Sequence, residues 1–174
     1  DYIKNTLKMK EQSKILLLAT EFTVKTGLYE QKLPDYQVMG QSAQILVKLA
    51  EAHENNYEVV DDITGKYKDM VDGVILGCTH FGYFEDEIIK STNCDNIIES
   101  AKVLAVKVKD YLESRRESMG MENNIFRVII PERTEIEIKD GVKKEKVRKM
   151  FPGYVLIEMV MSDEAWYVVR NTPG

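Results

Sequence analysis

The sequence has few cysteines, no long apolar run and no block of one charge sign. Two cysteines among 174 residues are too few for a disulfide framework and favour a reducing compartment. No apolar run approaches the roughly 18 residues of a membrane-spanning helix, and no signal peptide is recognisable, so we expect a soluble cytoplasmic protein. The net charge of −5 is dispersed, which argues against a general membrane or nucleic-acid binder.

What the sequence does contain is enough apolar material for a core, because 44% of its residues are hydrophobic. Its length suits one large or two small domains. The first 110 residues carry 13 basic and 18 acidic side chains, whereas the remainder carries 11 of each, so all the excess acidity lies in the first part. The chain begins at Asp1 without a methionine and stops at Pro173–Gly174, and we expect both ends to be cuts.

The first part alternates between strand and helix patterns. Short apolar runs at 14–19 and 73–77 are typical of buried strands, with weaker strands at 36–39 and 96–99. Between them the pattern predicts helices at 22–32 (capped by Thr20 and ended by Pro34), from 42, at 61–72 and at 85–90. This order is that of a parallel α/β sheet.

The polar residues Cys78, Thr79 and His80 follow directly on the apolar run 73–77. The carboxyl ends of parallel strands are where open α/β sheets bind ligands. A cysteine there can act as acid, base or nucleophile, and a neighbouring imidazole assists it. A buried cysteine packed as a small hydrophobe, beside a histidine bonded to backbone, is an equally weighted alternative.

The segment Leu76–Gly77–Cys78–Thr79–His80 resembles the second catalytic-cysteine motif of the cofactor-independent glutamate racemases. The segments 19–29 and 97–103 resemble that family's upstream and downstream pieces, and the match covers about residues 15–112. The resemblance implies a parallel, flavodoxin-like half-sheet. It also implies proton transfer at the α-carbon of glutamate or another amino acid, with no cofactor and no metal.

Individual roles follow from the same resemblance. Cys78 would be one acid/base, His80 and Glu21 would assist proton transfer, and Thr79 and Thr20 would hold the substrate. The family uses one cysteine on each of two lobes, however, and the lobe with the first cysteine is absent here. Cys94 matches no family motif and does not replace it, so we expect no evolved turnover, and glutamate would bind weakly.

From residue 112 onward the pattern changes to short strands and a final helix. Phe126, Val128 and Ile130 alternate as strand residues, Asp140–Gly141 is a hairpin turn dipeptide, and a helix follows Ser162 or Asp163. The segments 125–131, 136–141, 151–159 and 166–174 together resemble the N-terminal (NGN) domain of the transcription factor NusG.

This second resemblance implies a ferredoxin-like α+β fold that lacks its first and last strands. It implies docking on the clamp helices of RNA polymerase through Phe151 and Tyr154, weakened by the missing strand and without the KOW domain that would engage a second partner. Core packing is the alternative role for Phe151 and Tyr154, and we expect Trp166 in the core.

Five basic residues lie between 143 and 149. Such a run can meet phosphates, but a solvated hairpin arm is favoured because Glu132, Glu135 and Glu137 lie on the facing strand and can pair with it. We therefore expect no strong nucleic-acid binding.

The two patterns meet inside one predicted helix, residues 100–119. Natural tandem domains normally join in exposed linkers, so we interpret the chain as an engineered or recombined chimera that folds. Its parts are a racemase-like fragment (1–110) and an NGN-like fragment (111–174), with the helix shared. We further predict that strand 153–159 pairs beside strand 96–99 in one mixed sheet. A racemase-type enzyme and a polymerase-binding module remain the alternative functions.

Overall fold

The computed structural model describes residues 9–139, 142–149 and 153–173, with side chains described outside residues 133–152. The chain divides into two compact units, residues 1–101 and 102–174. Each unit is described by itself.

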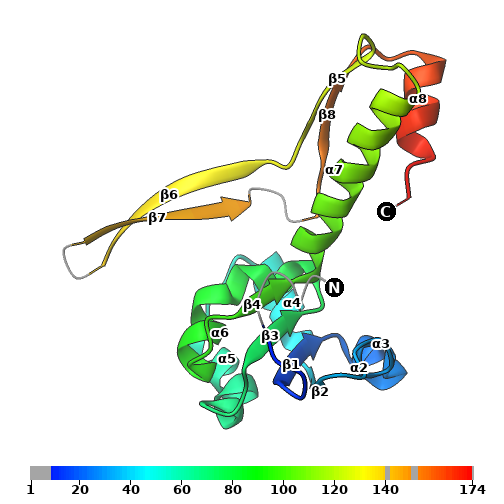
Figure 1. Ribbon diagram of the computed structural model, residues 1–174. Helices are drawn as coiled ribbons and strands as arrows, with labels where there is room; N and C mark the ends of the chain where they lie inside the picture. The colour runs from blue at the N-terminus through cyan, green and yellow to red at the C-terminus, as the bar shows by residue number, and fades with distance from the viewer. Residues whose placement is uncertain (1–8, 140–141, 150–152, 174) are drawn as a thin grey trace. The chain divides into compact units, whose positions relative to one another are not determined.

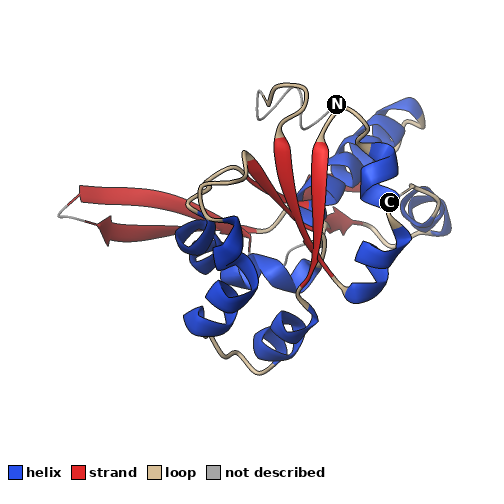
Figure 2. Ribbon diagram, turned by 90° about the horizontal axis from the view of Figure 1, so that it is seen from below, coloured by secondary structure: helices blue, strands red, loops and turns tan. Residues whose placement is uncertain are grey.

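The first unit is built on a four-stranded parallel sheet (Figures 1 and 2). Its strands are β1 (Lys14–Ala19), β2 (Gln37–Ser42), β3 (Gly73–Leu76) and β4 (Ile97–Glu99), in the order β2-β1-β3-β4. All three pairings are parallel, and β1 lies between β2 and β3. The predicted parallel α/β arrangement of the first part is confirmed.

Strands β1 and β3 are central because their sequences leave no polar face. Residues 15–19 and 73–76 are buried throughout, as expected for strands covered on both sides. The close approach of the two strands continues past β3, where the Gly77 N–H donates to the Leu18 carbonyl at 2.8 Å. A Cβ on Gly77 would lie 3.1 Å from the Cβ of Ala19, a tight contact that glycine avoids.

Helices complete the first unit, and two of them differ from the prediction. The single helix predicted at 22–32 is divided into α2 (Glu21–Thr26) and α3 (Leu28–Lys32), because Gly27 has a left-handed backbone with φ of 59°. The helix predicted at 61–72 begins earlier, as α5 (Tyr57–Thr64), because the Asn56 side chain caps it, and a 3₁₀ turn η1 (Gly65–Tyr67) follows. The others are α4 (Gln44–Glu51), the 3₁₀ helix η2 (Thr79–Phe84) and α6 (Glu85–Thr92).

One face of the sheet packs on helices α4, α5 and α6. The core there consists of buried side chains from these elements, namely Leu16, Leu18, Leu46, Val60, Val74, Leu76, Phe81, Phe84 and Ile88. All nine are apolar, and most lie in the predicted strands and helices, whereas Val60, Phe81 and Phe84 lie outside them.

The second unit contains most of helix α7 (Ser100–Ser118), strands β5 (Ile125–Ile129) and β8 (Leu156–Met159), and helix α8 (Asp163–Arg170). Helix α7 ends before Gly120, which has φ of 63°, as predicted. The Ser162 hydroxyl accepts a hydrogen bond from the Ala165 N–H and caps α8. The core of this unit is Leu112, Ile125, Val128, Ala165 and Val168.

Strand β5 does not alternate as predicted. Its pairing with antiparallel β8 matches Ile125 with Met159 and Arg127 with Glu158, so Phe126 is an extra residue in the ladder. Ile125 and Val128 are buried, whereas Phe126 is exposed. The bulge therefore breaks the predicted alternation, and Phe126 and Val128 do not share a buried side.

Strands β6 (Glu132–Lys139) and β7 (Val142–Lys149) form an antiparallel hairpin around the predicted turn dipeptide, which lies outside the described residues. Its register places Glu132 opposite Lys149, Glu135 opposite Lys146 and Glu137 opposite Lys144. The three glutamates therefore occupy the positions from which the sequence analysis expected them to offset the basic run.

The predicted mixed sheet is wrong for the described strands. Strand β8 pairs with β5 in a two-stranded sheet, and β4 pairs with β3. Strand β5 is nearer to β8 in the sequence than β4 is, and closing the smaller loop costs less conformational entropy. Within the described residues, no helix is long and apolar enough to cross a membrane.

Candidate functional site

Cys78 lies just beyond the carboxyl end of β3, where its extended backbone leads into helix η2. Leu76 is the last buried residue of the strand, and Cys78 itself is half-buried with a free thiol. The Phe81 N–H donates to the Cys78 carbonyl at 3.2 Å and closes the first turn of η2. Open α/β sheets bind ligands at such positions, beyond the carboxyl ends of their inner strands.

The imidazole of His80 lies between the thiol and a carboxylate. Its Nδ1 is 3.6 Å from Cys78 Sγ, which is hydrogen-bond range for sulfur. Its Nε2 is 3.7 Å from Glu51 Oε1, an ion-pair distance once the ring is protonated. Glu51 is the last residue of α4, and the Tyr83 hydroxyl of η2 donates to the His53 carbonyl just beyond α4 at 3.1 Å.

A second carboxylate supports η2 from the end of β4. Glu99 is 6% exposed, and a Cβ on Gly82 would lie 3.0 Å from its carboxyl carbon. Next to it, the Ser100 hydroxyl donates to the Leu76 carbonyl at 3.0 Å and is 3.1 Å from the Tyr29 hydroxyl. These contacts connect the ends of β3 and β4 beside the thiol.

The other residues of the predicted racemase-type site make no described contact with the thiol or the imidazole. The Thr20 hydroxyl accepts from the Thr23 N–H at 3.4 Å and caps α2. Glu21 is exposed and pairs with Lys25, one helical turn away. Among the described residues, no hydrogen bond or ion pair joins Thr20 or Glu21 to the thiol or imidazole. Thr79 is exposed beside Cys78.

The other cysteine differs in its surroundings. Cys94, in the loop after α6, is 6% exposed and packs in the main core. Burial raises the pKa of its thiol, and the nearby Asp95 and Asp72 add to this against an opposing backbone hydrogen bond from Asn96. The structure therefore gives Cys94 a packing role, consistent with its lack of a family motif.

The arrangement at Cys78 has the composition of an acid–base site: a thiol, an imidazole within reach of it, and a carboxylate on the far side of the ring. Three side chains arranged in this way can move a proton between sulfur and nitrogen and stabilise the imidazolium that results. Among residues 9–139, 142–149 and 153–173, no three His, Cys, Asp or Glu side chains gather closely enough to hold a metal ion.

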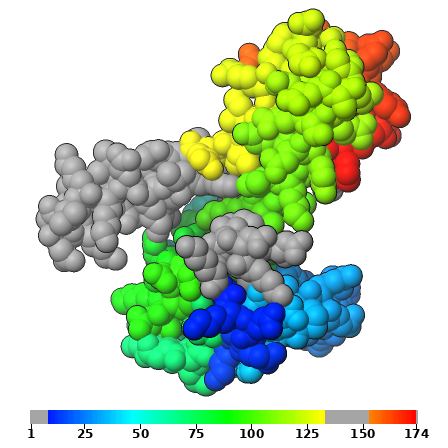
Figure 3. All heavy atoms as spheres, in the orientation of Figure 1, coloured from blue at the N-terminus to red at the C-terminus, as the bar shows by residue number. Residues whose placement is uncertain are grey.

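The second candidate surface belongs to the β5–β8 sheet. One side of this sheet packs on the core, and exposed apolar residues of its strands and their flanks are Phe126, Ile129, Tyr154, Leu156, Val160 and Met161. Tyr154 is 65% exposed, so the alternative that it packs in the core is wrong. Phe151 lies outside the described residues. The surface of residues 102–132 can be followed from green to yellow in Figure 3.

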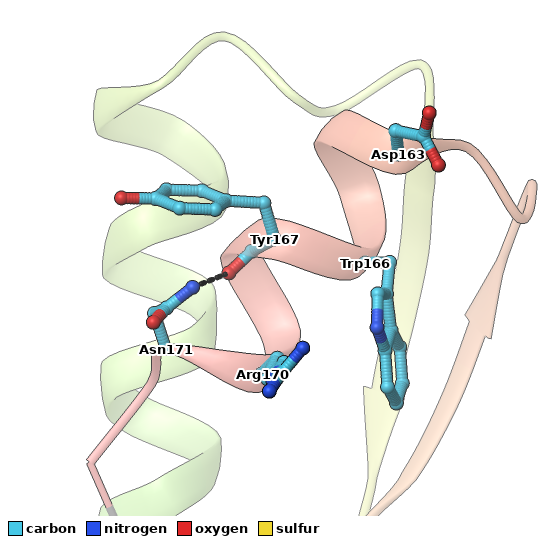
Figure 4. A pocket seen from close by; sticks show the side chains of 5 residues that line it. All are labelled: Asp163, Trp166, Tyr167, Arg170 and Asn171. Atoms are coloured by element: carbon cyan, nitrogen blue, oxygen red, sulfur yellow. Dashed lines mark hydrogen bonds between the residues drawn. The ribbon is translucent and has the colours of Figure 1, made fainter.

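A pocket of about 370 Å³ lies along the outer side of α8 (Figure 4). Its lining residues, Asp163, Trp166, Tyr167, Arg170 and Asn171, recur at helical spacing. The expectation that Trp166 is a core residue is wrong, because it is 48% exposed, while Ala165 and Val168 form the buried side of the helix. Figure 4 shows Trp166 and Tyr167 leaving α8 in different directions.

Comparison with known proteins shows what the second part of the chain is similar to. Residues 97–174 match the family model described as transcription termination factor nusG. The transcription termination/antitermination protein NusG of Bacillus subtilis is 63% identical over 68 residues, which is 39% of this chain and 38% of that protein. The NusG protein of Staphylococcus aureus strain Mu50 is 63% identical over 68 residues as well. The chain thus spans well under half the length of these relatives.

Among solved structures, the glutamate racemase from Aquifex pyrophilus is 28% identical and covers 55% of this chain and 40% of its own, with a TM-score of 0.44. The NusG resemblance inferred from the four segments between 125 and 174 is confirmed by the family match.

Glu51, Glu99 and Ser100 were not singled out by the sequence analysis. Glu51 lies in a helix distant in sequence from Cys78, and no spacing rule connects the two. Glu99 and Ser100 carried a weak signal, because they end the strand that neighbours β3, and polar residues at adjacent strand ends meet at one sheet edge.

Proposed function

We propose that residues 97–174 act as a NusG-type module that docks on RNA polymerase. The observation that carries this proposal is the family match over these residues, together with 63% identity to NusG proteins over 68 residues. Such a module would work where transcription takes place, and we infer the cytoplasm as its compartment. The termination and antitermination activities named for the full-length relatives are not assigned to this shorter match.

The exposed apolar side of the β5–β8 sheet supports docking by burial rather than by charge. Tyr154 and Phe126 are exposed aromatic side chains, of a kind that is enriched in protein interfaces, and Leu156 of β8 adds exposed apolar area. Residues 111–174 carry 11 basic and 11 acidic side chains, so long-range electrostatic attraction contributes little. Phe151 and Tyr154 remain the predicted contact residues.

The experiment is a binding titration of purified core RNA polymerase from Bacillus subtilis on the immobilised full chain. We expect Tyr154→Ala and Phe151→Ala each to weaken binding by about tenfold or more, because truncating an interface anchor loses its buried contacts. Phe22→Ala is the matched control, since Phe22 is 78% exposed in the other unit. Equal binding by all three variants and the parent chain, or no binding by the parent chain, would refute the proposal.

A second function is favoured by one observation, the 3.6 Å approach of Cys78 Sγ to His80 Nδ1. We propose that the first unit is a racemase-like half-site in a chimeric chain and that it exchanges the α-proton of glutamate slowly, with Cys78 as the base. Proton transfer needs a base within hydrogen-bond reach, and one lobe cannot enclose the substrate, so the exchange is far slower than turnover in a complete enzyme.

Incubation of D- and L-glutamate in deuterated buffer tests this second function by the loss of the α-proton signal in NMR. We expect slow exchange that disappears in Cys78→Ala and persists in Cys94→Ala. Exchange at the level of buffer alone in the parent chain would leave the first unit without this chemistry.

A further inference from the structure

We propose that Cys78 is a nucleophile that accepts an acyl group from small, uncharged activated esters or thioesters, with His80 as its general base and Glu51 as a positioning residue. The inference is independent of polymerase docking. It also differs from α-proton exchange, because here a bond forms to sulfur.

The proposal is based on three side chains that follow one another in space: a thiol, an imidazole and a carboxylate. Cys78 precedes η2, His80 belongs to its first turn, and Glu51 ends α4. The thiol faces one ring nitrogen at 3.6 Å and the carboxylate faces the other at 3.7 Å. A nucleophile, a base within reach of it and a third group that orients the base are the features of an activated nucleophile.

The step balances in protons and electrons. As Cys78 Sγ attacks the acyl carbon, an S–C bond forms and the thiol proton moves to His80 Nδ1. The bond from the acyl carbon to the leaving oxygen or sulfur then breaks, and the leaving group departs with that electron pair. It takes up a proton from the imidazolium or from water. Glu51 stabilises the imidazolium between these events.

Access and charge set the class of acyl donor. Cys78 is half-buried and the His80 side chain is 39% exposed, so a small group reaches the sulfur without any opening of the core. Glu51 beside the ring gives the site an acidic neighbour. Like charges repel, so anionic donors should react more slowly than neutral ones.

The test uses the full chain and p-nitrophenyl acetate, a neutral activated ester. We expect a burst of one p-nitrophenolate per chain and one acetyl group on the peptide that contains Cys78, found by mass spectrometry. His80→Asn should slow acylation by about 100-fold, the lower range of general-base contributions. His53→Asn, a change at the chain's other histidine, is the matched control and should leave the rate unchanged.

Glu51 is tested by a readout that loss of packing would not produce. Glu51→Gln should lower the maximal acylation rate without changing the KM for the ester, and Glu51→Asp should restore part of that rate, because a carboxylate at this position orients the ring and stabilises the imidazolium.

Three results would overturn the proposal: acylation of Cys94 in place of Cys78, equal rates in His80→Asn and the parent chain, or a maximal acylation rate that Glu51→Gln leaves unchanged. Failure of α-proton exchange or of polymerase binding leaves it standing, because those experiments measure different bonds and different surfaces.

Discussion

Solvent access distinguishes the two cysteines at the scale of single residues. Cys94 is buried in the core, whereas Cys78 is half-buried beyond the carboxyl end of β3, beside an imidazole. The thiolate is the reactive form of cysteine, and burial disfavours that charged form at Cys94.

We therefore predict that a thiol-specific alkylating reagent modifies Cys78 at least about tenfold faster than Cys94 in the folded chain. Peptide mapping after timed quenching measures both rates, and Cys78→Ser isolates the slower site. The prediction would be contradicted if Cys78 and Cys94 were alkylated at similar rates in the folded chain, both more slowly than in the denatured chain.

The raised pKa of Cys94 also predicts a pH dependence of stability. Because the folded pKa lies above the unfolded one, the folded state holds the proton more tightly, and stability falls as pH rises from the ordinary thiol pKa through the raised value. Replacing Cys94 by alanine removes this effect. The difference in unfolding free energy between the parent chain and Cys94→Ala should thus shrink at alkaline pH, as measured by urea titrations at several pH values.

Gly77 allows a comparison between two glycine substitutions. Gly77→Ala places a Cβ 3.1 Å from the Ala19 Cβ and 3.2 Å from the Leu18 carbonyl, neither of which can move freely. We expect a loss of about 1–3 kcal/mol in unfolding free energy. Gly65→Ala is the control, because its Cβ meets only the Asp61 carboxylate at the end of an exposed side chain. It should be neutral or slightly stabilising.

At the scale of elements, the first turn of α2 contains two residues with predicted site roles, Thr20 and Glu21, whose contributions to stability can be measured separately. The Thr20 hydroxyl caps this helix, and Glu21 makes an exposed ion pair with Lys25. Thr20→Ala should cost about 1 kcal/mol of stability, while Glu21→Gln should change stability by less than about 0.5 kcal/mol. Chemical denaturation measures both changes.

Glu21→Gln also tests the predicted catalytic role of Glu21. If Glu21→Gln abolishes α-proton exchange while leaving stability intact, Glu21 acts in the chemistry. If the exchange persists, its contribution is confined to the helix.

Elements were predictable to different extents for identifiable reasons. Strands β1 and β3 follow directly from runs of apolar residues, and the end of α7 follows from Gly120. The break at Gly27 and the bulge at Phe126 were not predicted. A glycine is tolerated inside some helices, and a bulge depends on the partner strand.

For the whole molecule, the important feature is that the two described cores share no residue. Leu16 belongs to the first and Val168 to the second, and both are fully buried. The chain's single tryptophan, Trp166, lies in the second unit, while the buried Cys94 lies in the first.

These positions provide two separate probes of unfolding. Leu16→Ala should lose about 2–5 kcal/mol and expose Cys94 to thiol reagents at lower urea concentration. Val168→Ala should lose about 2 kcal/mol and lower the midpoint reported by Trp166 fluorescence. Each variant should affect the probe in its own unit more strongly than the other, and equal shifts of both probes would show one cooperative transition instead.

The sequence by itself indicated the strands of the first part, the caps at Thr20 and Ser162, the hairpin strands around residues 140–141 and the resemblance to NusG proteins. Each of these depends on residues close together in the chain, through apolar periodicity, capping side chains or ordered motifs. The tertiary structure alone decided that Glu51 faces His80, that Trp166 is exposed and that β8 pairs with β5. These contacts join residues from separate elements, and they are fixed by how those elements pack, which no local pattern encodes.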